Sequence, residues 1–144
     1  MKDLRPLARR DARRAAFRRR YERYINSPRW WRRRERWLTD HLDYAGRPPV
    51  CAICDRNWTL ADDLHHITYA TLGHERHQDL VPMCRTCHED LHQILDLSKH
   101  WRSMTRVTAT HQLVALLRQR WTEADAVDVR GRTAGFDEAA GSDG

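Results

Sequence analysis

Residues 64–69 read LHHITY and residues 84–92 read CRTCHEDLH, and these two stretches decide how the middle of the chain folds. The first is rich in β-branched and aromatic residues and predicts a strand. Adjacent side chains of a strand point to opposite faces, so His65 and His66 are expected to have different neighbours. From His88 the pattern predicts a helix to about Leu97, on which His88 and His92 share one face. The spacing suits two imidazoles on a single cation.

Four cysteines lie on either side of the histidine pair, in two CxxC units, Cys51–Cys54 and Cys84–Cys87. In a reducing compartment such paired units are more often metal sites than disulfides. Zinc prefers four tetrahedral ligands, and each CxxC turn can deliver two thiolates to one ion. A site closed by four cysteines has no position for a substrate, so we predict a structural zinc. The alternative is four free or redox-active cysteines.

The segments around this centre are predicted to be mainly helical. Residues 3–25 have helical spacing, and Ser27 with Pro28 can cap and start a second helix over residues 28–44. Residues 80–83 suggest a short strand, which Pro82 restricts to a sheet edge or a strand end. A further amphipathic helix is expected over residues 106–122. The predicted divisions are an arginine-rich helical arm (1–46), a zinc-knuckle core (47–97), a C-terminal helix (98–124) and a disordered acidic tail (125–144).

Charge is distributed unevenly along the chain. Residues 1–36 contain 15 basic and 4 acidic side chains, whereas the whole chain has a net charge of +6. Such asymmetry indicates an arm that binds a polyanion, with DNA as the first candidate and an anionic membrane surface as the competitor. There is no long apolar run and no apolar signal core after the basic N-terminus. We therefore expect a cytoplasmic protein that does not span a membrane.

Taken together, these motifs resemble the HNH endonuclease family. The resemblance rests on the two CxxC pairs, the strand LHHITY, Leu72-Gly73, Asp79-Leu80-Val81 and the Cys87-His88 junction, which occur in family order. Residues 24–30 also resemble the helix that precedes the nuclease core in many phage and bacterial members, so the similarity covers about residues 21–92. It implies a small α+β fold, with a ββα-metal (HNH, or His-Me finger) core and zinc-bound CxxC pairs, flanked by N-terminal basic helices and a C-terminal helix.

The resemblance also implies a role for each residue of the site. His66 matches the general base that deprotonates the attacking water, and an unperturbed imidazole suits that task near neutral pH. His65 and His88 match ligands of a catalytic divalent cation (Mg²⁺, Mn²⁺, Ni²⁺ or Zn²⁺), and His92 would be a further ligand, as in colicin-type members. Asp79 stands where the family usually has its middle asparagine, and an ionised carboxylate accepts hydrogen bonds but donates none.

These expectations point to a metal-dependent endonuclease that hydrolyses DNA phosphodiester bonds. The arginines expected to contact phosphates are Arg32, Arg33, Arg34 and Arg36 on the second helix and Arg76 and Arg85 near the site. Solvated surface charge is the alternative for Arg76 and Arg85. For the whole chain, the alternatives are a non-catalytic zinc-knuckle DNA-binding module and a protein that docks on phage packaging or restriction machinery. The oligomeric state stays open.

Overall fold

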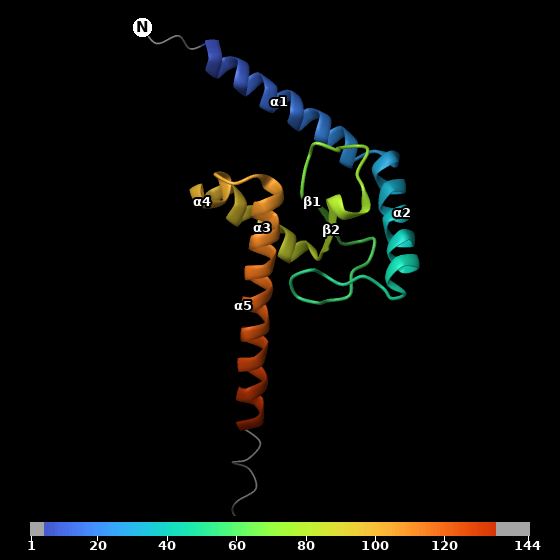
Figure 1. Ribbon diagram of the computed structural model, residues 1–144, viewed down its shortest axis with the longest axis vertical. Coiled ribbons are helices and arrows are strands. Elements are labelled where there is room, and N and C mark those ends of the chain that lie inside the picture. Colours follow the sequence, from blue (N-terminus) through green and yellow to red (C-terminus); the bar gives the residue numbers. More distant parts are fainter. Residues whose placement is uncertain (1–4, 135–144) are drawn as a thin grey trace, which may run out of the picture.

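The protein is a small α+β molecule that is mostly helical, with one two-stranded antiparallel sheet. The computed structural model describes residues 5–134 (Figure 1). No helix within that range is long and apolar enough to cross a membrane. The elements in chain order are α1 (Arg5–Ile25), α2 (Pro28–Ala45), β1 (Asp63–His66), a 3-10 turn η1 (His77–Asp79), β2 (Leu80–Met83), α3 (Arg85–Leu97), α4 (Lys99–Arg102) and α5 (Arg106–Ala134).

The break between α1 and α2 confirms the predicted capping residues. Ser27 has extended backbone angles, and its hydroxyl accepts a hydrogen bond from the Trp30 amide. Pro28 occupies the first position of α2, where the missing N–H costs nothing. At the other end, Gly46 adopts a left-handed conformation with φ 64° and returns its N–H to the Leu42 carbonyl. The result is a second helix that packs against the sheet at an angle to α1 (Figure 1).

The sheet lies between two apolar clusters. In β1, Asp63 pairs with Met83 and His66 pairs with Leu80. One cluster contains Trp30, Trp37, Trp58, Leu64 and Leu80, and the other contains the cysteines with Met83, Leu91, Leu95, Ala109 and Leu113. Trp30 and Trp37 thus anchor α2 to the sheet through the first cluster.

Three predicted boundaries differ from the structure. The strand predicted over residues 64–69 is shorter and ends at His66, although the Ile67 amide still donates to the Asp79 carbonyl. Helix α3 begins at Arg85, three residues before the predicted start, because the Cys84 sulfur accepts the Cys87 amide. Residues 125–134 continue α5 instead of forming a disordered tail, and residues 135–144 lie outside the described residues. Extending an existing helix fixes one residue per hydrogen bond, and these residues contain no proline.

Helix α5 is attached to the rest of the molecule along its first part. Ala109, Thr110 and Leu113 are buried in the core. Further along, the Arg118 guanidinium donates two hydrogen bonds to the Asp55 carboxylate, at 2.8 and 3.0 Å, and a third to the Ala52 carbonyl. Ala52 and Asp55 belong to the first cysteine turn. Helix α5 thus stabilises the loop that carries Cys51 and Cys54 (Figure 1).

Candidate metal centres and the groove beside them

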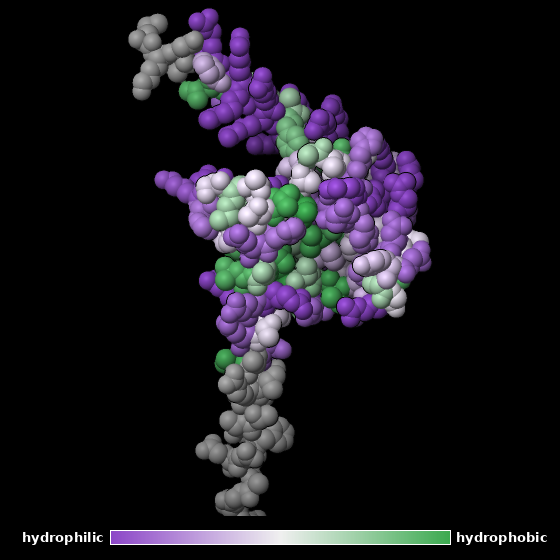
Figure 2. Space-filling model, viewed as in Figure 1, coloured by the Kyte–Doolittle hydropathy of each residue, from purple (hydrophilic) through white to green (hydrophobic). Residues whose placement is uncertain are grey.

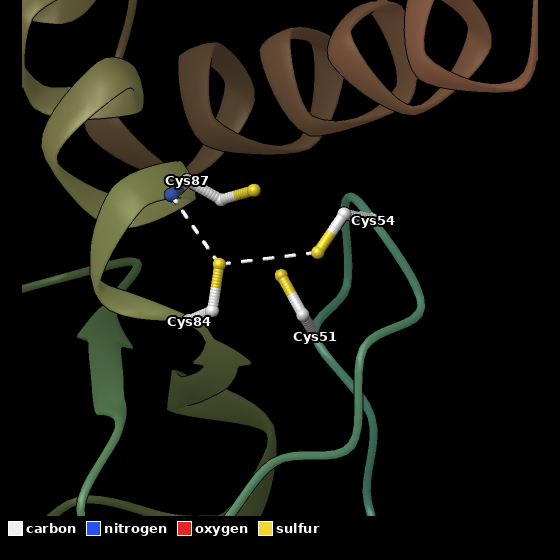
Figure 3. A group of neighbouring side chains, drawn as sticks. All are labelled: Cys51, Cys54, Cys84 and Cys87. Carbon is white, nitrogen blue, oxygen red and sulfur yellow. Dashed lines mark hydrogen bonds between the residues drawn. The ribbon is translucent and has the colours of Figure 1, made fainter. Parts of the chain in front are cut away.

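The four cysteines come together as one cluster, although the two pairs lie 29 residues apart in sequence. Cys51 and Cys54 lie on the loop after α2, and Cys84 and Cys87 lie at the start of α3 (Figure 3). All four sulfurs lie within 4.8 Å of one another, and none forms a disulfide. Cys54 Sγ and Cys84 Sγ are 3.8 Å apart. Sulfurs placed about 2.3 Å from a tetrahedral zinc would be separated by about 3.8 Å, so the cluster has dimensions suited to that ion.

The surroundings of the cluster show how local backbone shapes each cysteine turn. After Cys51, the chain turns back through Asp55, which has φ 58°, so that the Cys51 amide donates to the Arg56 carbonyl. Burial, followed by the neighbouring Cys84 sulfur, raises the pKa of the Cys87 thiol. Burial also raises the pKa of the Cys54 thiol, whereas at Cys51 burial is outweighed by backbone hydrogen bonds, which lower the pKa. A bound cation would offset the cost of ionising Cys54 and Cys87. These residues fit a metal ion.

A second cluster consists of the three histidines predicted to bind the catalytic cation. His65 comes from β1, and His88 and His92 lie one turn apart on α3. One ring nitrogen from each lies within 4.8 Å of the other two. His88 Nε2 and His92 Nε2 are 3.1 Å apart, and His65 Nδ1 is buried without a hydrogen-bond partner among the described residues. The structure thus assembles all three predicted ligands around one point.

Neighbouring side chains fix the orientation of two of these rings. His88 Nδ1 lies 3.1 Å from the Asp63 carboxylate, which leaves Nε2 facing the cluster. His65 Nε2 lies 3.3 Å from the Thr110 hydroxyl, which leaves Nδ1 facing it. Carboxylates and hydroxyls that hold the second nitrogen of a histidine are typical of metal sites. Sequence reasoning missed Asp63 and Thr110, because neither belongs to a recognisable pattern of ligands.

The three imidazoles are neutral near pH 7, which is the form that binds metals. Burial lowers the pKa of His65 strongly, and the nearby Arg106 lowers it further. Burial also lowers the pKa of His88, although the Asp63 carboxylate opposes that shift. For His92, burial followed by the proximity of His88 lowers the pKa to about 4. Lone pairs are therefore available without the need to displace a proton.

His66 faces the opposite side of the sheet, as strand alternation requires. It is 2% exposed, and its ring stacks on Trp30 at a centroid distance of 4.9 Å. Its Nε2 lies 3.1 Å from the Glu75 carboxylate, which also accepts hydrogen bonds from the Tyr24 hydroxyl (2.8 Å) and the Gly73 amide (2.9 Å). Sequence reasoning missed Glu75, because it lies in a loop with no motif of its own.

Glu75 is ionised despite its complete burial. Burial by itself would raise the pKa of this carboxyl, but the hydrogen bonds from His66, the Gly73 amide and Tyr24 outweigh it and lower the pKa to about 2. An ionised Glu75 accepts the N–H of His66 and thereby places the proton on Nε2. His66 Nδ1 makes no hydrogen bond within the described residues.

Asp79 stabilises the loop before β2 and does not contact His66. Its carboxylate accepts hydrogen bonds from the Thr71 hydroxyl and from the amide and guanidinium of Arg76, at 2.9 to 3.2 Å. Its own carbonyl accepts from the Ile67 amide, one residue after His66. The Asp79 carboxylate therefore braces this loop through accepted hydrogen bonds only.

The arginines predicted to bind phosphates differ in exposure and in hydrogen bonding. Arg33 is 8% exposed and donates to the Glu75 carbonyl, and Arg34 donates to the carbonyls of Leu60 and Asp62. Both guanidinium groups thus hold loops, and their contact with phosphates stays a prediction. Arg32 and Arg36 are exposed on α2. Arg76 and Arg85 are exposed too, and they lie beside Asp79 and Asp63 respectively.

Arginines of α1, which were not singled out from the sequence, line a groove beside the histidine cluster. The groove has a volume of about 600 Å³, and His92 forms part of its wall. Figure 2 shows hydrophilic side chains running the length of α1. Tyr21 and Tyr69 are also part of the wall, whereas His66 is not. The arginines that line the groove are Arg10, Arg13, Arg14, Arg18 and, from α5, Arg106.

Comparison of the chain with family models, with curated proteins and with solved structures found no match. Functional inference therefore depends on the site geometry. That geometry consists of two clusters of potential metal ligands, a buried histidine–glutamate pair and a basic groove.

Proposed function

We propose that this protein is a metal-dependent endonuclease of the HNH type, with a ββα-metal core formed by β1, β2 and α3. The observation that carries the proposal is the convergence of His65, His88 and His92, whose ring nitrogens lie within 4.8 Å of one another. His65 Nδ1 is buried without a hydrogen-bond partner among the described residues, and a buried unpaired nitrogen costs stability. The half-buried His88 and His92 turn their Nε2 atoms toward the same point. A divalent cation would satisfy all three.

Within this proposal the two clusters have different tasks. The four thiolates would hold a structural zinc that joins the first cysteine turn to α3, since a site with four protein ligands is closed. The three imidazoles would hold a catalytic cation and leave positions for substrate oxygens. When bound, that cation would stabilise the negative charge that develops on a phosphodiester during hydrolysis. Imidazole ligands favour Mn²⁺, Ni²⁺ or Zn²⁺ over Mg²⁺ more strongly than a set of carboxylates would.

His66 would act as the general base. Glu75 holds the proton on Nε2, so that Nδ1 can accept a proton from water, and the same carboxylate would stabilise the imidazolium that results. Trp30 and Tyr21 restrict the ring to one orientation, with centroid distances of 4.9 and 5.9 Å from it. Arg106 donates a hydrogen bond to the His66 carbonyl and so connects the backbone of the base to α5.

One observation favours a second candidate function, a zinc-knuckle DNA-binding module without catalysis. His66 is only 2% exposed, and its Nε2 already has a hydrogen-bond partner in the Glu75 carboxylate. Such a pair can be a buried structural element that holds α1 and α2 on the sheet. In that case the basic groove would bind DNA and the histidine cluster would contribute only to folding.

Cleavage of supercoiled plasmid distinguishes the two candidates. We expect nicking in Mn²⁺, Ni²⁺, Zn²⁺ or Mg²⁺, and a loss of at least about 100-fold in rate for His66→Asn, whose amide can still donate to Glu75. His74→Ala, in the exposed loop nearby, is the matched control and should cleave like the wild type. Cleavage that survives in His66→Asn would remove His66 as the base. DNA binding without cleavage in any of the four metals would establish the binding module.

The histidine cluster can be tested without measuring cleavage. Titration of the zinc-loaded protein with Mn²⁺ or Ni²⁺ by calorimetry should reveal one additional site, which is lost in His88→Gln. His111→Gln, an exposed histidine on α5, is the control that should retain the site. Equal binding by both variants would show that the cation lies elsewhere.

A further inference from the structure

The side chains that line the groove beside the histidine cluster indicate which form of nucleic acid it can bind. One wall is α1, which presents Arg10, Arg14 and Arg18 along one side. Eight residues of helix extend about 12 Å, which is enough to contact more than one phosphate of a strand. All of these side chains are exposed and make no ion pair among the described residues. The wall is therefore a line of cations available to a polyanion.

Aromatic rings accompany these arginines. Phe17 and Tyr21 of α1 and Tyr69 of the loop after β1 all line the groove. They form a cluster with centroid distances of 5.1 Å for Phe17–Tyr69 and 5.4 Å for Tyr21–Tyr69. Each ring is partly exposed. Rings interleaved with arginines are the arrangement that binds unpaired bases by stacking while the cations contact the backbone.

The opposite wall connects the groove with the proposed cation site. His92, one of the three clustered histidines, belongs to the lining, and so does Arg106 at the start of α5. Asp96 of α3 is the one acidic residue of the lining, against five arginines. The Arg106 guanidinium lies 4.2 Å from the centre of the Tyr69 ring, and its Nη2 makes no hydrogen bond among the described residues. A phosphate in the groove would thus lie between α1, Arg106 and the cation ligands. In a duplex, by contrast, the bases are paired and cannot stack on Phe17 or Tyr69.

We infer that the groove between α1 and the α3–α5 side of the molecule binds a single unpaired DNA strand and leads it to the histidine cluster. This inference rests on the proposed nuclease function, because the bound strand is a substrate only if the protein cleaves DNA. Its test measures binding alone. The substrate would be single-stranded DNA, or an unpaired segment within a duplex. Helix α1 would then be part of the substrate site and not only a general electrostatic arm.

Fluorescence anisotropy with a labelled oligonucleotide tests the inference. The full chain is first treated mildly with EDTA, so that zinc stays at the cysteines, the histidines hold no cation and nothing is cleaved. We expect the single strand to bind more tightly than a duplex of the same sequence.

The variant Arg10→Gln with Arg14→Gln should weaken single-strand binding about tenfold or more at low salt, and should reduce the slope of log affinity against log salt concentration by roughly 1.4. Arg19→Gln with Arg23→Gln removes the same charge from α1 outside the groove and should change affinity less than about twofold. Phe17→Leu should weaken single-strand binding about fivefold or more and leave duplex binding unchanged.

Two results would overturn the inference. One is duplex binding as tight as single-strand binding, and the other is an equal loss of affinity in the two double variants. Neither depends on catalysis. If no metal supports cleavage while the groove variants behave as expected, the nuclease proposal fails and the binding site stands. If cleavage occurs but the two double variants bind alike, the groove inference fails and the nuclease proposal stands.

Discussion

The arrangement around His66 depends most on the side chain of Glu75. Its carboxylate is fully buried and accepts hydrogen bonds from His66, Tyr24 and the Gly73 amide. In Glu75→Gln the amide NH₂ would face groups that themselves donate, so at least one donor loses its acceptor. We expect a loss of about 1–3 kcal/mol in the free energy of unfolding, measured by urea denaturation at pH 7. Glu89→Gln, exposed on α3, is the control, and an equal effect of the two substitutions would contradict this role.

A second residue-scale prediction concerns His92 and pH. The pKa of His92 lies at about 4, below its ordinary value of 6.5. Between these values the unfolded chain binds a proton that the folded chain does not, so stability falls as pH decreases through this window. One such proton corresponds to at most about 1.4 kcal/mol per pH unit. In metal-free buffer, His92→Gln should show a shallower fall between pH 6.5 and 4 than the wild type. Parallel stability curves for the two proteins would contradict the prediction.

At the scale of elements, the sequence was most informative where a local rule applies. Ser27 and Pro28 define the start of α2 because capping depends on adjacent residues alone. The alternation of His65 and His66 follows from strand geometry, and the two side chains do have different neighbours. The roles of Glu75, Arg33 and Arg106 could not be predicted in this way. Each depends on contacts 9 to 42 residues away along the chain, which only the packing of helices on the sheet creates.

The loop that contains Glu75 allows a test of how one backbone position influences the site. Gly73 has φ 86°, and its amide donates to Glu75. A side chain at positive φ costs about 1–2 kcal/mol, so Gly73→Ala should lower the unfolding midpoint. Gly46→Ala, at φ 64° with nothing near the new methyl group, is the matched control with similar strain at the end of α2. We expect both to be destabilised but only Gly73→Ala to lose DNA cleavage, and equal activity would show that the loop does not position His66.

At the scale of the whole molecule, α3 links the two clusters of potential metal ligands. It begins at the Cys84–Cys87 turn and carries His88 and His92 within its first eight residues. Helix α5 braces the other cysteine turn through Arg118 and reaches His65 through Thr110. The position of the histidines therefore depends on the cysteine cluster, although the two share no residue. Because this dependence runs in one direction only, the proposed structural zinc and the proposed catalytic cation can be separated by experiment.

Chelation should act in two stages. A mild treatment with EDTA is expected to remove the cation from the proposed histidine site, where His88 and His92 are only half-buried, and added Mn²⁺ should restore cleavage with the helical circular dichroism unchanged. Removal of the thiolate-bound zinc by a stronger chelator, or Cys84→Ser, should unfold β1, β2 and α3, because the binding energy of a structural zinc is largely folding energy. In that state Mn²⁺ alone should not restore either helicity or cleavage. Zinc content, circular dichroism at 222 nm and plasmid nicking, measured on the same samples, check this order of events. Full helicity in protein that contains no zinc would show that packing of α3 against Ala109 and Leu113 of α5 suffices to hold the fold.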